Sequence, residues 1–515
     1  MTGNDNKWLI ALTVIMGTIM SALDTSIVNV ALPFMRGNLG ASIDEITWVA
    51  TGYMLSNVII MPIIGMLSSR FGRKRLYGFS IFLFTVSSML CGMSWSLGSL
   101  VMFRIIQGVG GGALIPVSQA ILRESFPPEE QGMAMGIYGF GVVLGPAFGP
   151  TLGGWLTDNY SWPWIFYINV PIGIINLLLV YRFLHDPAYL KREKRKIDFP
   201  GLGLLIVGLG ALQLMLEKGE RQDWFQSDFI VLLLGIAVIG LSLFIFWELT
   251  TDKPVVNLRL LKDANFASGT LLGGILGMGL YGSLFLLPLF LQQILGYPAF
   301  DSGLALMPRS LAMALAMPVA GRFYNKMGPR LLIGVGLVIT AFSFWQLSAI
   351  SLDVGFWDIF APQFMQGLGF GMIFVALSTA ALSTIRKTMM TDAAGLYNVV
   401  RQVFGSIGIS LTATQLTRGE FIYSSVLSEN VNVFNQKVNN WVGVMTGAFA
   451  QKGADRITAH DRALQLLNSN LMRQAAMLAY NRVFLFVTLL FIGAIPLVIL
   501  LKSGAHSPSG EIMVD

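Results

Sequence analysis

The chain has 515 residues, of which 54% are hydrophobic and only 12% are charged. Soluble domains carry about 25% charged residues, so this composition excludes an ordinary water-soluble fold and predicts a polytopic membrane protein. The single cysteine excludes an internal disulfide, and the three scattered histidines form no local metal-binding motif, so we expect neither metal nor cofactor. The net charge of +6 is not concentrated in a polar basic domain, which argues against nucleic-acid binding.

Fourteen apolar runs are long enough to cross a bilayer as helices, because a spanning helix needs about 20 apolar residues and backbone groups in lipid must be paired. The first six lie near residues 8–32, 46–68, 76–97, 99–122, 133–156 and 162–184. Two follow near 199–216 and 229–249, and the last six lie near 266–293, 302–321, 331–351, 357–382, 395–416 and 483–501. The first run is too long for a signal peptide and contains Asp24, so we expect it to stay attached.

The distribution of Lys and Arg predicts the orientation of these helices. With the N-terminus in the cytoplasm, the inner segments hold 21 of the 34 Lys and Arg residues, whereas the six short outer loops hold three. Positive residues favour the inner side, so both termini are predicted to be cytoplasmic. The basic run Lys191 to Lys196 is expected to fix topology and contact lipid headgroups. Within the long outer loop 417–482, the spacing of residues 463–478 is compatible with an amphipathic helix.

Two sequence patterns occur twice, which predicts a duplicated architecture. Met61, Pro62, Gly65 and Gly72 recur 256 residues later as Met317, Pro318, Gly321 and Gly328. Gln107, Gly108, Gly110 and Gly112 recur 259 residues later as Gln366, Gly367, Gly369 and Gly371. We therefore expect two parallel six-helix repeats with two extra helices between them. The predicted units are an N-terminal bundle (1–184), a basic linker with the extra helices (185–265), a C-terminal bundle containing the loop 417–482 (266–502), and a tail (503–515).

Asp24 is the one acidic residue placed deep in an apolar run, the others being in loops, tails or helix ends. Burial favours the neutral form of a carboxyl group, so Asp24 is suited to taking up and releasing a proton, and an intramembrane acid is a functional candidate. The alternative is a carboxylate permanently paired with an arginine for packing. Arg104 also lies within an apolar run, where it either tunes Asp24 electrostatically or braces backbone carbonyls.

Weaker candidates accompany this pair. Arg401, Gln107 and Asn398 are secondary candidates for proton coupling, and Ser21, Tyr53 and Asn57 are weak candidates for a substrate cavity. Arg309 is several turns from the inner end of its helix, and we expect its side chain to extend outward toward polar surroundings in a structural role.

Several motifs resemble those of the fourteen-helix drug:proton antiporters of the major facilitator superfamily, and within them the EmrB-like permeases. The first-helix motif is Leu23 to Pro33, the fourth-helix motif contains Leu100, Arg104, Gln107, Gly108 and Gly110, and a further typical segment is Trp164 to Gly173. The glycine–proline motif that marks antiporters comprises Gly141, Gly145, Pro146, Gly149, Pro150, Gly153 and Gly154. The inner-gate loop contains Gly65, Arg70, Gly72 and Arg73. Ser69 replaces the acidic residue usual in that loop, which argues against the ion pair normally assigned there.

The resemblance implies an all-helical major facilitator fold and an antiporter that exports hydrophobic toxic compounds in exchange for protons by alternating access. It also implies an inner-membrane location, a periplasmic EmrA-like adaptor and a TolC-like outer-membrane channel as partners, and a bending role for the glycine–proline motif. The alternatives are a proton-coupled solute symporter and an exporter of one specific metabolite. An enzyme is not expected, since no nucleophile–base pair is visible, and the missing GxxxxGK motif argues against ATP-driven pumping.

Overall fold

The computed structural model describes residues 7–186, 198–252, 254–432 and 434–501, and within these ranges the regular elements are helices. The predicted all-helical major facilitator fold is confirmed. The basic run Lys191 to Lys196 and the tail 503–515 lie outside the described residues.

The N-terminal half contains the first six crossings. Its helices are α1 (Lys7–Leu39), α3 (Trp48–Ile60) continuing through a 3₁₀ turn into α4 (Ile64–Phe71), α5 (Arg73–Gly92), α6 (Leu97–Ser125), α7 (Gln131–Asn159), and α8 (Trp164–Tyr167) with α9 (Asn169–Phe183). A short helix, α2 (Ile43–Ile46), precedes α3, and its capping box joins Ser42 to Glu45. These bounds agree with the predicted apolar runs to within several residues.

The middle and C-terminal parts supply the remaining crossings. The two extra helices are α10 (Phe199–Lys218) and α11 (Asp228–Thr250). They are followed by α12 (Ala264–Leu289), α13 (Ala299–Leu347), α14 (Phe356–Ala381), α15 (Met390–Glu429), α16 (Gln436–Gln451) and α17 (Arg456–Ala494).

The structure reconciles two ways of counting the crossings. Twelve helical stretches among the described residues are long and apolar enough to span a membrane. One of them contains α13, whose backbone at Gly328 is not helical, so this element is two helices joined at a bend. The more polar α15 packs between α12 and α17. Dividing α13 and adding α15 gives the fourteen crossings predicted from the sequence.

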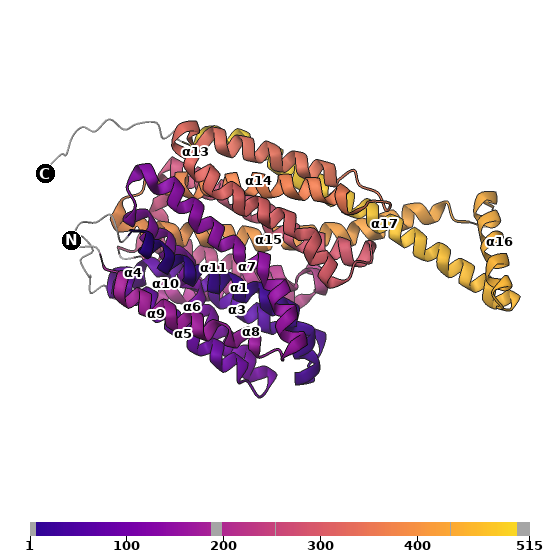
Figure 1. Cartoon of the computed structure of the whole chain (residues 1–515), viewed down its shortest axis with the longest axis horizontal. Coiled ribbons are helices and arrows are strands. Elements are labelled where there is room, and N and C mark those ends of the chain that lie inside the picture. The colour runs from indigo at the N-terminus through magenta and orange to yellow at the C-terminus, as the bar shows by residue number, and fades with distance from the viewer. Residues whose placement is uncertain (1–6, 187–197, 253, 433, 502–515) are drawn as a thin grey trace.

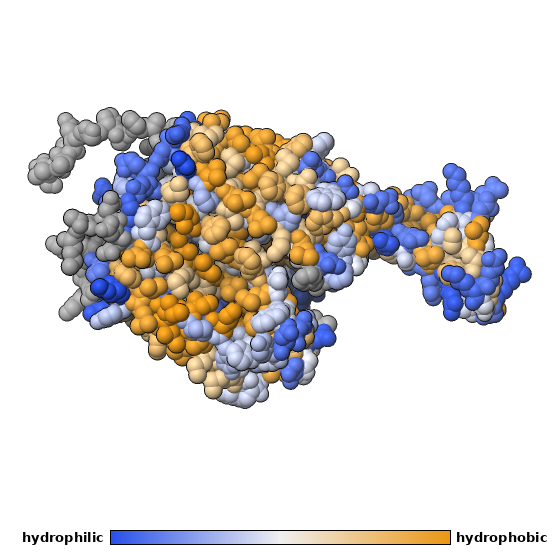
Figure 2. Space-filling model, in the orientation of Figure 1, coloured by the Kyte–Doolittle hydropathy of each residue, from blue (hydrophilic) through white to orange (hydrophobic). Residues whose placement is uncertain are grey.

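The helices form one elongated bundle from which a helical extension projects (Figure 1). The first and last described residues lie at the end of the bundle opposite to the extension; we call this end the terminal face. A broad apolar band covers the bundle, and hydrophilic residues gather at the terminal face and on the extension (Figure 2). This pattern is that of a polytopic membrane protein, whose apolar side chains contact lipid rather than water.

The predicted repeat has a structural counterpart. Gly72 and Gly328 have nearly the same backbone angles, φ 85° and ψ 157° against φ 76° and ψ 158°. These positive φ values favour glycine because it has no Cβ. Gly108 and Gly367 make equivalent close approaches, to the backbone carbonyls of Tyr53 and Arg309 respectively. Arg309 therefore occupies, in the second repeat, the position that Tyr53 has in the first.

The two extra helices contact both halves of the molecule. On α10, Glu217 accepts a hydrogen bond from Thr51 of α3, and Gln213 donates to Ser406 of α15 at 2.8 Å. Trp224, which follows α10, donates to Thr414 of α15, also at 2.8 Å. The extra pair therefore lies alongside both the N-terminal and the C-terminal bundle.

The predicted outer loop 417–482 is largely helical. The end of α15, α16 and the first part of α17 form the extension, and α17 covers the segment 463–478 that was compatible with an amphipathic helix. Asp455 caps α17 by accepting hydrogen bonds from the backbone N–H groups of Ile457 and Thr458, both at 3.2 Å. Its hydrogen bonds, first with the Thr458 side chain and then with the backbone, hold the pKa of Asp455 below its usual value.

Candidate functional site

Asp24 lies at the centre of a buried polar cluster in the N-terminal half. Its side chain is fully buried, and its Oδ2 accepts a hydrogen bond from Nη1 of Arg104 at 2.5 Å. Its Oδ1 accepts from Nε2 of Gln107 at 2.9 Å and from Nδ2 of Asn169 at 3.1 Å. Both carboxylate oxygens are thus paired, and the arginine balances the negative charge.

Arg104 makes both kinds of contact that the sequence left as alternatives. Besides the ion pair with Asp24, its Nε donates to the backbone carbonyl of Val49 on α3 at 3.1 Å. Its guanidinium lies 4.2 Å from the ring centroid of Tyr53 and 5.7 Å from that of Phe166. The same side chain therefore sets the electrostatic environment of the acid and links α6 to α3.

The local folding of three helices brings this cluster together. Arg104 and Gln107 are three residues apart on α6, so they lie on one face of that helix. Asn169 begins α9 directly after the break between α8 and α9, and it also donates to Ser88 of α5 at 3.1 Å. The role of Asn169 was not predicted from the sequence, although a polar residue within the apolar segment Trp164 to Gly173 was a usable signal.

The three weak cavity candidates lie close to this cluster. The hydroxyl groups of Ser21 and Tyr53 are 3.1 Å apart and share a hydrogen bond, and Asn57 follows Tyr53 by one helical turn. All three are buried in this conformation, and Gly111 lets α6 approach the side chains of Tyr53 and Asn57. Their assignment to a substrate cavity stays a prediction.

The secondary candidates for proton coupling lie in two different parts of the structure. Gln107 belongs to the Asp24 cluster, whereas Arg401 and Asn398 lie on α15 in the C-terminal half. Asn398 donates from Nδ2 to Oε1 of Gln119 on α6 at 2.6 Å, which joins the two halves. Gln119 is fully buried and was not singled out from the sequence.

The expected outward extension of the Arg309 side chain is wrong. Its side chain is 4% exposed rather than extended outward, and Nη1 donates to Ser283 at 3.2 Å and to Gln366 at 3.4 Å. The prediction considered only the distance along the helix, whereas tight packing against Gly367 of α14 encloses this position. Arg309 is therefore buried, and its hydrogen-bond partners Ser283 and Gln366 are neutral.

The inner-gate loop lies at the terminal face and joins the two halves. Arg73 donates from Nε to Thr391 at 2.9 Å and from Nη2 to the Lys387 carbonyl at 3.1 Å. It also forms an ion pair with Glu124, at the end of α6, so a carboxylate accompanies this arginine even though residue 69 is Ser. The other three predicted loop residues behave differently: Gly65 approaches Asp392, Gly72 forms the turn, and Arg70 is exposed.

Further hydrogen bonds between the halves gather near this face. Arg123 donates to the Thr379 carbonyl at 2.7 Å, and Asn325 donates to the Glu129 carbonyl at 2.5 Å. Together with the contacts of Arg73 and Asn398, they hold the two halves together at the terminal face.

The glycine–proline motif lies in α7, which is continuous from Gln131 to Asn159. Four of its glycines face α1, where a Cβ atom would come within 3 Å of a neighbouring heavy atom; they are Gly141, Gly145, Gly149 and Gly153. Gly154 has open space around it, and Pro146 and Pro150 lie within the helix. The contacts explain the close packing of α7 on α1, and the bending role stays a prediction.

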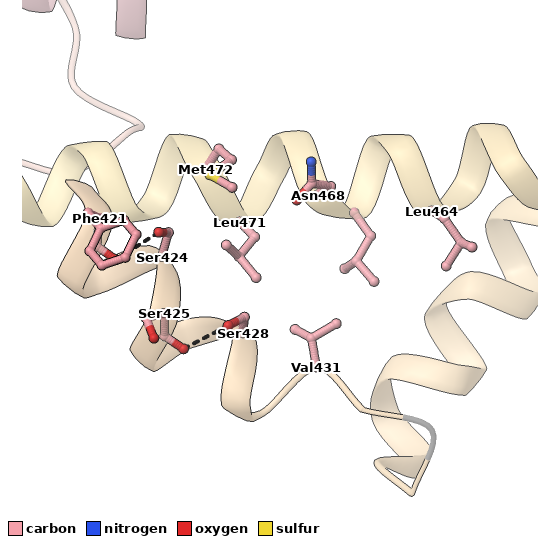
Figure 3. Close-up of a pocket in the computed structure, with 10 residues that line it drawn as sticks. Phe421, Ser424, Ser425, Ser428, Val431, Leu464, Asn468, Leu471 and Met472 are labelled. Atoms are coloured by element: carbon pink, nitrogen blue, oxygen red, sulfur yellow. Dashed lines mark hydrogen bonds between the residues drawn. The ribbon is translucent and has the colours of Figure 1, made fainter. Parts of the chain in front are cut away.

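The extension carries a groove between the end of α15 and the start of α17 (Figure 3). Its volume is about 360 Å³, and apolar side chains with several serines line it. Phe421 and Met472, on opposite walls, are 76% and 49% exposed. Large exposed apolar side chains on an otherwise polar segment are typical of an interaction surface.

Comparison with known families and proteins agrees with this architecture. The sequence model of the Major Facilitator Superfamily matches residues 14–409. The chain is 41% identical over 432 residues to the multidrug export protein EmrB of Haemophilus influenzae, covering 83% of this chain and 84% of that protein. It is 36% identical over 502 residues to the fatty acid resistance protein FarB of Neisseria gonorrhoeae, covering 97% of each.

Among solved structures, the fold is similar to that of the human organic anion transporter MFSD10. The TM-score is 0.61 and the sequence identity 13%, and the match covers 95% of this chain and all of that one. At this identity the likeness concerns the fold alone.

Proposed function

Because the chain belongs to the Major Facilitator Superfamily, we propose that it is a proton-coupled antiporter that exports hydrophobic toxic compounds by alternating access. The observation that carries the proposal is the fully buried Asp24, whose charge is balanced by Arg104 at 2.5 Å. The relatives named for multidrug export and fatty acid resistance support the export of apolar compounds. The resemblance of α7 to antiporters favours this function over a solute symporter or an exporter of one metabolite.

Asp24 is the proton carrier in this proposal. Protonation neutralises the carboxylate, removes its charge-assisted hydrogen bonds and leaves the buried Arg104 without a counter-charge, which is costly in low dielectric. The cluster then favours an arrangement in which Arg104 is paired again, and so the protonation state biases the equilibrium between conformations. Asn169 and Gln107 orient the carboxylate between these states.

The distribution of positive charges supports an orientation and a location for the protein. We place the terminal face in the cytoplasm and the extension in the periplasm, in agreement with the excess of Lys and Arg in the predicted inner segments. The hydrogen bonds at the terminal face then close the cytoplasmic side, and the chain is an inner-membrane protein.

The partners are an EmrA-like periplasmic adaptor and, beyond it, a TolC-like outer-membrane channel. The extension is the described segment that projects farthest from the bundle (Figure 1), and its groove offers apolar side chains to a partner. A docked adaptor is expected to cover Phe421 and Met472.

Proton coupling is tested in inside-out vesicles with an imposed pH gradient and the hydrophobic fluorescent compound N-phenyl-1-naphthylamine. Wild-type protein should accumulate the compound when the gradient is present. Asp24→Asn should abolish gradient-driven accumulation and leave the protein folded, because the amide resembles the protonated acid. Asp228→Asn, which changes an exposed carboxylate at the start of α11, is the matched control and should transport normally. Normal transport by Asp24→Asn would contradict the proposal.

Docking is tested by replacing residues 425–475 with a short Gly/Ser linker, and more finely by Phe421→Ser combined with Met472→Ser. Both changes should lower whole-cell resistance while transport in vesicles, which needs no adaptor, stays at the wild-type level. Ile457→Ser, at a position that is 76% exposed outside the groove, is the control. If resistance survives both changes, the extension does not dock the adaptor.

A further inference from the structure

Arg401 of α15 is a buried cation with unused hydrogen-bonding capacity. Its side chain is 7% exposed, and its Nη1 has no hydrogen-bond partner in the described residues. The guanidinium lies 5.2 Å from the ring centroid of Phe374 and 5.9 Å from that of Tyr397. Aromatic faces stabilise a cation only partly, so the charge of Arg401 lacks a full counterpart.

Two neighbouring side chains at the junction of the halves also have unused polar atoms. Asn398 is three residues from Arg401 and so lies on the same face of α15. Its hydrogen bond to Gln119 uses one atom of each amide, and Nε2 of Gln119 and Oδ1 of Asn398 have no partner in the described part of the chain. The hydrogen bond from Asn398 to Gln119 of α6 places these amides at the junction of the two halves.

No carboxylate in the described part of the chain balances the charge of Arg401. Arg309, which is also buried, likewise forms no ion pair with a carboxylate of the described residues. The negative charge of Asp24 is already matched by Arg104. A buried arginine normally requires compensation, and here two of the three unused polar atoms, Nη1 of Arg401 and Nε2 of Gln119, are donors.

We propose that Arg401, together with Gln119, binds the negatively charged group of an amphiphilic organic anion, a carboxylate or sulfonate carried on an apolar body. The anion supplies the missing counter-charge and accepts from the unused donors, and Phe374 and Tyr397 contact the adjoining apolar part. This inference rests on the proposed export function, since the organic anion is a cargo of the transporter. It assigns to Arg401 the recognition of the cargo rather than the coupling of protons.

The position of the site suits a cargo that crosses between the halves. Arg401 is one turn further from the terminal face than Asn398, whose bond to Gln119 helps to join the halves there. Separation of the halves breaks this bond, which frees one N–H group of Asn398, next to Arg401, to donate to the anion.

The test compares two ligands that differ in charge but little in shape, naphthalene-1-sulfonate and the neutral naphthalene-1-sulfonamide. Their dissociation constants are measured by calorimetry at pH 7 on the full-length protein in lipid nanodiscs. The wild type should bind the sulfonate about tenfold more tightly, as expected for one charge-assisted hydrogen-bonded contact. Arg401→Gln should remove this preference by weakening sulfonate binding alone, and Arg401→Lys should retain part of it. Arg182→Gln, at an exposed arginine near the end of α9, should change neither constant.

The possible outcomes separate this inference from the proposed function. If Arg401→Gln weakens both ligands equally, Arg401 only maintains packing and the inference is overturned. Unchanged sulfonate binding overturns it as well, and so does a wild type that does not prefer the sulfonate. In each case the proposed export function is tested separately, by the vesicle transport of neutral N-phenyl-1-naphthylamine. If Arg401→Gln does not fold, Arg401→Lys replaces it, since a loss confined to the sulfonate is expected there too.

Discussion

The two halves of the molecule share a backbone plan but differ in how their buried charges are satisfied. In the N-terminal half, Arg104 and Asp24 form an ion pair whose carboxylate accepts three hydrogen bonds. In the C-terminal half, Gln363 and Gln366 take the repeat positions of Arg104 and Gln107, and the arginine has moved to the position of Tyr53, as Arg309. Duplication thus preserved the helix contacts while the charges diverged.

This difference indicates that the two halves have different functions in transport. A balanced acid–arginine pair changes its net charge when it gains a proton, which suits the N-terminal half to proton exchange. The C-terminal half has two buried arginines, Arg309 and Arg401, without carboxylate partners in the described ranges, and several amide atoms there are unpaired. Such a site gains most from a ligand that brings its own negative charge. The following predictions test whether the two clusters differ as their contacts indicate.

The largest expected difference in stability is between variants of two buried arginines, Arg104 and Arg309. Arg104→Met should lower the free energy of unfolding by about 3–5 kcal/mol, because it leaves the Asp24 carboxylate buried without its counter-charge. Arg309→Met should change it by less than about 1 kcal/mol, because the loss of two long hydrogen bonds is offset by removing an unbalanced buried charge. Unfolding by SDS titration in mixed micelles measures both.

A double variant is the control for this prediction. Adding Asp24→Asn to Arg104→Met should recover much of the lost stability, because the uncompensated carboxylate is then absent. Equal losses for the two single arginine variants, or no recovery in the double variant, would show that the halves do not differ in charge balance.

The sequence was sufficient to predict the helices and the repeat, because both depend on patterns along the chain. Apolar runs of spanning length identify helices, and the recurrence of Gly72 as Gly328 correctly indicated two equivalent turns. The amphipathic spacing in 463–478 likewise indicated a helix, now the start of α17. What the pattern did not reveal is that α15 continues far beyond its apolar run, or that the helix at 463–478 is continuous with the last crossing.

Residues of the site could be predicted only where a charged side chain lies within an apolar run, which is unusual in itself. Asp24 and Arg104 stood out as charges in apolar runs, and they proved to be partners. Gln119 did not, because its importance comes from Asn398, a neighbour that is distant in sequence. The same limitation explains the wrong expectation for Arg309, whose burial depends on the approach of α14.

An intermediate difference in the free energy of unfolding is expected between variants of two buried glutamines, Gln107 and Gln363. Gln107 uses both ends of its amide, donating to Asp24 at 2.9 Å and accepting from Arg104 at 2.8 Å. Gln107→Leu should therefore lower the free energy of unfolding by about 1.5–3 kcal/mol, the usual range for hydrogen bonds to charged groups. Neither amide atom of Gln363 has a partner in the described residues, so Gln363→Leu should be neutral or stabilising. A stability loss of similar size in both variants would contradict the comparison.

The smallest expected difference in the free energy of unfolding is between variants of two buried tyrosines whose rings lie beside arginines. Tyr53 shares a hydrogen bond with Ser21 at 3.1 Å, whereas the hydroxyl of Tyr397 has no partner in the ranges that the structure describes. Tyr53→Phe should lower the free energy of unfolding by about 1 kcal/mol, the net value of one neutral hydrogen bond. Tyr397→Phe should leave it unchanged or raise it slightly, because it removes a buried polar group that is not satisfied. Both variants keep the aromatic faces next to Arg104 and Arg401, so the same unfolding titration isolates the hydroxyl groups. A larger loss for Tyr397→Phe than for Tyr53→Phe would mean that the Tyr397 hydroxyl is satisfied after all, and it would contradict this part of the comparison.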